Sequence, residues 1–150
     1  MENCNSLREL SFHCTLRTSD NPSVLLVTAH PDDEVMFFAP LIWELIQLGA
    51  SIFLLCLSIG DYDGLGHLRR EEFYRAAPLL GLNASMISIV EDPALQDGWG
   101  KWDSNAVLRH VSALGESLSI SAVITFDDHG VSGHPNHIAV YEALYSKTIK

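Results

Sequence analysis

The sequence predicts an α/β protein of three layers, in which helices cover both faces of a mostly parallel sheet. Two observations support this fold class. Short apolar runs of strand length alternate with longer amphipathic segments, and no repeat or linker divides the chain. Such alternation is typical of β–α–β units, whose strands lie parallel. Because ligands bind at the carboxyl ends of parallel strands, we expect the functional residues directly after the strands.

Four apolar runs have the length and composition of buried strands. The predicted strands cover residues 23–29, 52–57, 86–90 and 122–126, and the predicted helices cover residues 33–48, 65–80, 103–115 and 135–147. Gly49 and Gly81 end the first two helices, because glycine readily adopts the left-handed conformation that follows a helix. Asp103 is expected to cap the third helix, and Pro135 to open the fourth.

The two ends of the chain differ from its centre. Residues 1–22 are largely polar and lack the apolar core of a signal peptide, so we expect a flexible leader there. Residues 23–150 form the expected domain. The chain ends at Lys150 directly after a predicted helix. Since four strands are few for a doubly wound sheet, this domain is expected to be incomplete at its carboxyl end.

Length and composition exclude several classes of protein. The chain has 150 residues, 47% of them hydrophobic and 19% charged, with a net charge of −10. A domain of this size buries a sizeable core, whereas the acidic surplus argues against a protein that coats nucleic acid or anionic lipid. No apolar run approaches the roughly 18–20 residues of a transmembrane helix. Cys4, Cys14 and Cys56 are an odd number without a disulfide spacing, which predicts reduced thiols.

The segment AHPDDE at residues 29–34, after the first predicted strand, is the strongest functional signal. It brings together an imidazole and three carboxylates, which are metal ligands and proton acceptors. The alternative is structural, since acidic side chains in the first turn of a helix cap it and complement its dipole. His30 and Pro31 are not needed for capping, which favours a functional role.

A second histidine-rich segment, GVSGHPNH at residues 130–137, follows the fourth predicted strand. His134 and His137 stand at positions i and i+3 and therefore share one face of a helix. His30, Asp33 and one of these two histidines would supply the three protein ligands of a catalytic zinc ion. Asp32 would then act as the general base, and the remaining histidine as an acid or an oxyanion donor.

These motifs resemble those of the PIG-L/LmbE-like family of zinc-dependent N-acetylglucosamine de-N-acetylases, over about residues 24–145. The segments LVTAHPDDE at 26–34, VITFD at 123–127 and GVSGHPNH at 130–137 are specific to that family. GLGHLRREE at 64–72 resembles the family's arginine-containing helix. Within the family, the chain is most similar to the eukaryotic members of the pathway that makes glycosylphosphatidylinositol (GPI) anchors. The resemblance implies a Rossmann-like fold.

The resemblance also implies a role for each residue of the two segments. Zinc would be bound by His30, Asp33 and His137. Asp32 would activate the attacking water. His134 would stabilise the tetrahedral intermediate or protonate the leaving amine.

Three further residues are implied in substrate binding. Arg69 would face the phosphate or sugar of the substrate; the alternative is an exposed cation that pairs with Glu71 or Glu72. Asp97 and Trp102 would line the sugar pocket, and core packing is an equal alternative for Trp102.

Asp127 and Asn136 are expected to act behind the site. Asp127 would orient a zinc-binding histidine, or alternatively form a turn. Asn136 stands where bacterial members of the family often carry aspartate, a carboxylate that would tune His134.

The implied reaction is the zinc-dependent hydrolysis of the N-acetyl group of N-acetylglucosaminyl-phosphatidylinositol, a glycolipid, in GPI-anchor biosynthesis. The implied location is the cytosolic face of the endoplasmic reticulum, or the cytoplasm if the chain has no membrane anchor. One alternative is a shortened, inactive isoform or a non-catalytic partner subunit. Another is a deacetylase of a soluble N-acetylglucosamine conjugate. No nucleic-acid partner and no membrane span are expected.

Overall fold

The sheet of the computed structural model, which describes residues 21–148, confirms the predicted α/β class. Most of the expected leader, including Cys4 and Cys14, lies outside the described residues. The elements follow in this order: β1 (Ser23–Thr28), α1 (Asp33–Met36), α2 (Ala39–Gln47), β2 (Ser51–Cys56), α3 (Gly66–Leu79), η2 (Ala84–Met86), β3 (Ile87–Ile89), η3 (Pro93–Leu95), α4 (Ser104–Ser117), β4 (Ala122–Ile124), α5 (Gly130–Gly133) and α6 (Pro135–Thr148).

Four parallel strands form one sheet in the order β3-β2-β1-β4. The central strand β1 pairs with β2 along its whole length, from Ser23 opposite Ser51 to Thr28 opposite Cys56, and with β4 on its other side. All residues of β1 after Ser23 are buried. Burial of both faces is expected of a parallel strand between two layers of helices.

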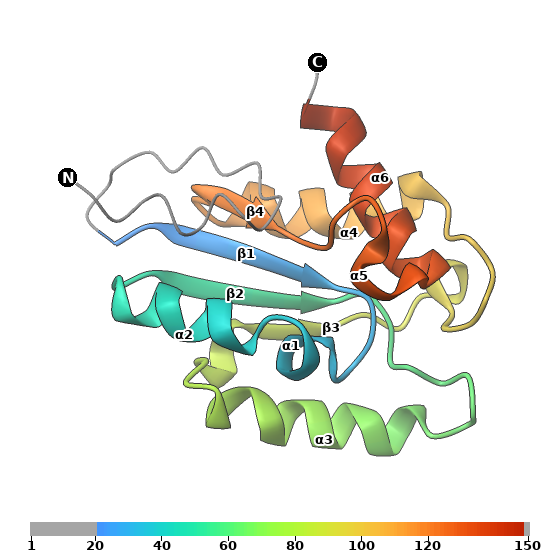
Figure 1. Cartoon of the computed structure of the whole chain (residues 1–150), viewed down its shortest axis with the longest axis horizontal. Coiled ribbons are helices and arrows are strands. Elements are labelled where there is room, and N and C mark those ends of the chain that lie inside the picture. The colour runs from blue at the N-terminus through green and yellow to red at the C-terminus, as the bar shows by residue number, and fades with distance from the viewer. Residues whose placement is uncertain (1–20, 149–150) are drawn as a thin grey trace.

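Helices α2 and α3 lie on one side of the sheet, and α4 and α6 lie on the other (Figure 1). This arrangement follows from right-handed crossovers, because the chain moves outward from β1 to β3 and then returns to the opposite side of β1. The core lies between these layers. Its fully buried side chains include Leu25, Ile42, Leu54, Phe73 and Val140.

The predicted helix over 33–48 is wrong in one respect, because the structure divides it into α1 and α2. Pro40 lies in the first turn of α2. Proline has no N–H to donate, and its ring collides with the carbonyl four residues earlier in a continuous helix. The Phe38 ring lies in the break and packs against Phe126, with 5.4 Å between the ring centroids. The acidic segment therefore has a short helix of its own at the end of β1.

The other predicted boundaries agree with the structure to within a few residues. Gly49 has a φ of 75° after α2. The Asp103 side chain accepts a hydrogen bond from Asn105 N (3.1 Å) at the start of α4, and α6 begins at Pro135. No helix among residues 21–148 combines the length and apolar character needed to cross a membrane.

Candidate metal centre and active site

The two histidine-containing segments meet at the carboxyl end of β1. Figure 1 shows the chain leaving the arrowhead of β1 close to α5 and the start of α6. His30 and His137 are 107 positions apart in the chain, yet His30 Nδ1 lies 3.1 Å from His137 Nε2. Both rings are buried, as is Asp33.

Asp33 is fixed by the backbone that precedes it. Its Oδ2 atom accepts hydrogen bonds from Ala29 N (3.0 Å) and His30 N (2.7 Å). Its Oδ1 atom lies 3.2 Å from His137 Nε2. The capping alternative does not describe this segment, since Asp33 bonds backward to the strand end and Asp32, at the N-cap of α1, makes no side-chain capping bond.

Two contacts at Nε2 of the His30 ring determine which of its nitrogens carries the proton. Nε2 is 3.0 Å from Asn136 Oδ1 and 3.0 Å from Asp97 Oδ1. Both partners are acceptors, so Nε2 carries the proton, and Nδ1 of the neutral ring presents its lone pair. Burial lowers the pKa of His30, but its contacts with Asp97 and the charge of Asp33 outweigh burial and raise it above its ordinary value.

The His137 ring is oriented in the same way by a backbone group. Nδ1 lies 3.0 Å from the carbonyl oxygen of Gly130, which only accepts, so Nδ1 carries the proton and Nε2 presents its lone pair. The Phe126 ring stacks on His137 with 4.0 Å between centroids and 1° between planes. The imidazole plane is therefore held by packing as well as by a hydrogen bond.

These three residues fit a divalent cation. The lone pairs of His30 Nδ1 and His137 Nε2 face each other beside the Asp33 carboxylate, an arrangement that is repulsive until a positive charge lies among them. Zinc bonds of about 2.0–2.1 Å place tetrahedral ligands about 3.3–3.4 Å apart. The observed separations of 3.1 and 3.2 Å from His137 Nε2 are close to that spacing.

His134 is a third imidazole at the same place. Within the described part of the chain, ligand atoms of His30, His134 and His137 lie within 4.8 Å of one another. His134 Nδ1 accepts a hydrogen bond from Asn136 N (3.3 Å), so the proton of the neutral ring lies on Nε2. Burial and the neighbouring histidines lower the pKa of His134 below its ordinary value. A neutral ring with a free N–H is suited to stabilise an oxyanion.

Asp32 lies at the edge of this cluster, with its side chain 54% exposed. Burial raises the pKa of the Asp32 carboxyl, although Arg69, whose Nη2 atom is 3.2 Å away, offsets part of the rise. A raised pKa makes a carboxylate a stronger proton acceptor. The geometry thus separates an accessible carboxylate from the buried carboxylate of Asp33.

Arg69 points into the site rather than toward the glutamates of α3. Nη1 donates to Gly60 O (2.8 Å) and Nη2 to Pro31 O (2.8 Å). Glu71 pairs instead with Arg75 (2.8 Å). Of the two alternatives for Arg69, the exposed cation paired along the helix is therefore not the one observed.

Asp97 joins the histidine cluster to the arginine. Its Oδ1 lies 3.0 Å from His30 Nε2, and its Oδ2 lies 3.3 Å from Arg69 Nη1. Burial opposes ionisation, but the contacts with His30 and Arg69 prevail and lower the pKa of Asp97. Trp102 is 5% exposed and donates its Nε1–H to Gln96 O (2.7 Å). Its ring packs in the core and lies 5.9 Å from the His30 ring, so it also borders the cluster.

The hydrogen bonds of Asp127 differ from those of a residue that orients a zinc-binding histidine. Its Oδ1 atom accepts from His129 N (3.1 Å) and Val131 N (2.8 Å). These contacts match the turn-forming alternative. The partner of His137 Nδ1 is the Gly130 carbonyl within the same turn.

Asn136 is fully buried, and its side chain contacts His30 rather than His134. Its Oδ1 atom lies 3.0 Å from His30 Nε2 and also accepts from Gly98 N (3.3 Å). Its Nδ2 atom donates to Gly100 O (2.8 Å). Asn136 contacts His134 through its backbone N–H. A side chain at this position is therefore placed to orient His30 rather than to tune His134.

The structure adds three residues that the sequence analysis did not assign to the site. Trp99 is 73% exposed, and its ring lies 5.3 Å from the His134 ring; its position between two glycines was the available signal. Gly130, with a φ of 60°, supplies the carbonyl that orients His137. Glu34 is 1% exposed, and burial raises its pKa to about 7.

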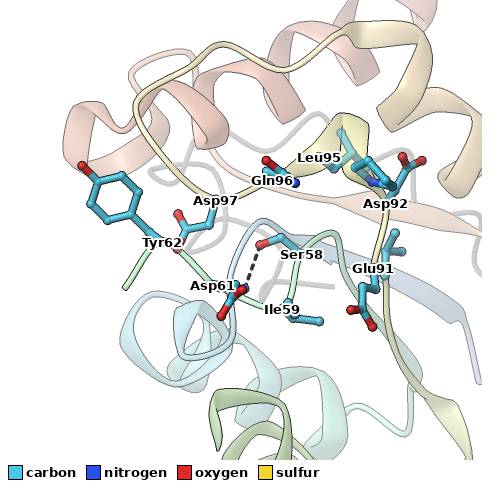
Figure 2. A pocket seen from close by; sticks show the side chains of 12 residues that line it. Ser58, Ile59, Asp61, Tyr62, Glu91, Asp92, Leu95, Gln96 and Asp97 are labelled. Carbon is cyan, nitrogen blue, oxygen red and sulfur yellow. Dashed lines mark hydrogen bonds between the residues drawn. The ribbon is translucent and has the colours of Figure 1, made fainter. Parts of the chain in front are cut away.

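A cavity of about 600 Å³ lies beside the cluster, at the carboxyl ends of β2 and β3. Figure 2 shows the side chains of Asp61, Glu91, Asp92 and Asp97 around this cavity, with Tyr62 at one end. Asp97 borders both the cavity and His30. Carboxylates accept hydrogen bonds from hydroxyl groups, so the lining suits a polyhydroxylated ligand.

Comparison with known proteins identifies the family. The family described as PIG-L, GlcNAc-PI de-N-acetylase, matches residues 25–147. The probable N-acetylglucosaminyl-phosphatidylinositol de-N-acetylase of Schizosaccharomyces pombe is 48% identical over 122 residues, which are 80% of this chain and 49% of the relative. The N-acetylglucosaminyl-phosphatidylinositol de-N-acetylase of Bos taurus is 44% identical over 125 residues, which are 80% and 48%. The chain spans about half the length of these curated relatives.

Solved structures share the fold. The N,N′-diacetylchitobiose deacetylase from Pyrococcus horikoshii superposes with a TM-score of 0.68 at 21% identity, over 95% of this chain and 55% of that one. The conserved protein TT1542 from Thermus thermophilus gives a TM-score of 0.64 at 23% identity, over 82% and 53%. These likenesses confirm the expected three-layer, Rossmann-like sandwich.

The family match and the relatives at 44–48% identity agree with the motifs at residues 29–34 and 130–137. Those two motifs are also the segments that meet in the histidine cluster. The chain belongs to the PIG-L family of GlcNAc-PI de-N-acetylases.

Proposed function

We propose that this chain hydrolyses the N-acetyl group of N-acetylglucosaminyl-phosphatidylinositol, giving glucosaminyl-phosphatidylinositol and acetate with the aid of zinc. The observation that carries the proposal is the convergence of His30 Nδ1 and Asp33 Oδ1 on His137 Nε2, at 3.1 and 3.2 Å. The names of the eukaryotic relatives support the substrate. A relative from Mycobacterium leprae, 26% identical, is named 1D-myo-inositol 2-acetamido-2-deoxy-alpha-D-glucopyranoside deacetylase. The names share an acetamido sugar joined to inositol.

His30, Asp33 and His137 would hold the metal, with His134 beside them. Zinc, when bound, supplies a Lewis acid for the acetyl carbonyl and lowers the pKa of water. Asp32 accepts a proton from the attacking water, a task that its raised pKa favours. The water oxygen bonds to the carbonyl carbon, and the N–H of His134 donates to the oxygen that becomes negatively charged.

The second half of the reaction returns the proton. The bond between the carbonyl carbon and the amide nitrogen breaks, and the proton held by Asp32 passes to the leaving nitrogen. The products are acetate and the free amino sugar. The cavity beside Asp97 would take the hydroxyl groups of the substrate.

The glycolipid substrate places the proposed reaction at a membrane surface. We expect it on the cytosolic face of the endoplasmic reticulum; the resemblance to members of the GPI pathway supports this location. Protease digestion of sealed microsomes from cells that express the chain tests this location, since a cytosolic-face protein is degraded without detergent.

The central experiment measures amine release from N-acetylglucosaminyl-phosphatidylinositol in detergent micelles by the zinc-loaded chain. We expect turnover that a chelator abolishes. Asp32→Asn is expected to lower kcat by about 10²–10⁴-fold while zinc content stays constant, and His137→Ala to lose zinc. Asp128→Asn, a change of an exposed aspartate, is the matched control and should leave both quantities unchanged.

Each alternative predicts a different result. A zinc-loaded chain that releases no amine supports the shortened, inactive form or the non-catalytic partner. Release from a soluble N-acetylglucosaminyl-inositol, without release from the lipid, supports the deacetylase of a soluble conjugate. An Asp32→Asn variant with nearly full activity refutes the assignment of the base.

A further inference from the structure

The backbone of Asp32 adopts a conformation that is rare for any residue except glycine. Its φ is 114° and its ψ is −25°. Side chains with a Cβ atom disfavour this left-handed region, so the conformation persists only where neighbouring groups impose it. Neighbouring groups, and not the intrinsic φ and ψ preference of aspartate, therefore hold the proposed general base in this conformation.

Arg69 and Glu34 hold the peptide group between Pro31 and Asp32 from opposite sides. Its carbonyl oxygen accepts a hydrogen bond from Arg69 Nη2 (2.8 Å). Its N–H group donates to Glu34 Oε2 (3.1 Å). The arginine donates to the negative end of the peptide dipole and the Glu34 oxygen accepts from the positive end, which fixes the peptide plane from both sides.

Both side chains of this clamp are themselves fixed. Glu34 is 1% exposed, so its carboxylate has little freedom. The other guanidinium nitrogen of Arg69 donates to Gly60 O (2.8 Å) and to Asp97 (3.3 Å). Gly60 has no Cβ, and one built there would overlap the guanidinium group. Arg69 therefore lies against the backbone of residue 60.

We propose that Glu34 is a positioning residue, which together with Arg69 clamps the Pro31–Asp32 peptide and directs the Asp32 carboxylate toward the reacting water. This inference rests on the proposed function. Loss of the clamp lets φ of Asp32 relax to negative values, and rotation about the N–Cα bond then turns the carboxylate away. Arg69 itself also contacts Asp32 Oδ2 (3.2 Å), so the clamp fixes both ends of the base.

A purely structural role for Glu34 explains less. An acidic residue in the first turn of a helix complements the helix dipole without burial, and α1 is only four residues long. The carboxylate of Glu34 is instead withdrawn from water and bonded to the N–H of Asp32. This placement is explained if the backbone of residue 32 must be held in its left-handed conformation.

The test compares Glu34→Met, which keeps the size of the side chain and removes the acceptor, with Glu34→Gln, which retains an acceptor oxygen. We expect Glu34→Met to lower kcat by about 100-fold, the scale of a small misplacement of a catalytic group. KM and zinc content should stay constant, and Glu34→Gln should restore most of the rate. In the Asp32→Asn background, Glu34→Met should cause no further loss. Glu44→Ala, a change of an exposed glutamate on α2, is the matched control.

A second measurement needs neither zinc nor turnover. Amide hydrogen exchange of Asp32 in the labelled chain should accelerate on the order of 10-fold in Glu34→Met and stay near the wild-type rate in Glu34→Gln. Unchanged exchange, loss of zinc from Glu34→Met, or a further loss of kcat in the Asp32→Asn background would each overturn the proposal. If the wild-type chain releases no amine, the proposed function fails, and the exchange rates alone decide whether the clamp exists.

Discussion

Replacing Asn136 with leucine is expected to weaken zinc binding and lower stability together. Asn136 is fully buried, and its side chain bonds to His30 Nε2 (3.0 Å), Gly98 N (3.3 Å) and Gly100 O (2.8 Å). Leucine has a similar volume and fills the same space. The change therefore removes hydrogen-bond partners without leaving a large cavity.

The magnitude follows from the groups left behind. A buried polar group without a partner costs about 1–3 kcal/mol. Gly98 is half-buried and Gly100 is exposed, so water replaces part of the loss, and the expected cost is about 2 kcal/mol in the free energy of unfolding. For a chain of this size, that cost lowers Tm by about 4–8 °C. His30 keeps Asp97 as an acceptor, and losing one of its two orienting partners should weaken zinc binding by about 10–100-fold.

The assay combines zinc competition against a chromophoric chelator with thermal unfolding of the metal-free chain. Asn136→Asp retains an acceptor for His30 and is expected to bind zinc more tightly than Asn136→Leu. Asn105→Leu, a change of an exposed asparagine on α4, controls for the substitution itself. A leucine variant with wild-type zinc affinity would refute the claim that Asn136 orients His30.

Three further predictions concern other parts of the molecule. Gly60→Ala should unfold at lower temperature and lose activity, because the new Cβ displaces the Arg69 guanidinium group. Gly64 has a similar φ of 72° with open space around it, so Gly64→Ala should show only the backbone cost of about 1–2 kcal/mol. Equal effects of the two changes on thermal unfolding and on activity would contradict this prediction. Burial raises the pKa of the Cys56 thiol and keeps an alkylating reagent away from it. Alkylation of Cys56 at pH 8, followed by mass spectrometry, should therefore be on the order of 100-fold slower in the folded chain than in urea. Rapid labelling would show that β2 opens. A hydrogen bond from His110 (2.8 Å) lowers the pKa of Asp92 below 3.8. The ionised Asp92 therefore stabilises the fold above pH 3.8, and this contribution is lost as the pH falls through the lower pKa of the folded state. The unfolding free energies of the wild type and Asp92→Asn should converge in acid, and a difference that stays constant with pH would contradict the ion pair.

Local sequence patterns predicted the fold because the apolar runs and the residues at the helix ends indicated the same boundaries between strands and helices. The apolar runs gave the strands, and Gly49, Asp103 and Pro135 marked helix ends through backbone properties that need no tertiary context. The division between α1 and α2 was missed although its signal was present. Pro40 and the two phenylalanines before it were included in one amphipathic helix, although a proline at that place disfavours a continuous one.

The site was predictable where residues are adjacent in the chain and less so where packing decides. Both motifs were expected at strand ends, and the structure brings His30 and His137 together. The partner of Asn136 was missed because neighbours in sequence are not neighbours on a helix. Two positions after His134, the side chain of Asn136 points to another face, and there it contacts His30. The left-handed backbone of Asp32 depends on Arg69 from α3, and no local pattern contains that contact.

The long separation between His30 and His137 has a consequence for how the protein is made. During synthesis, His30 and Asp33 leave the ribosome early, but the third proposed ligand follows only after β4 has been added beside β1. A zinc ion that needs all three residues cannot bind the growing chain until residues 30–137 have emerged. Once bound, the ion would link the end of β1 to α6 and close a loop of residues 30–137, and metal bound only by the folded state stabilises that state by mass action. Metal capture would thus follow the synthesis of the start of α6 and would report that residues 30–137 have folded together.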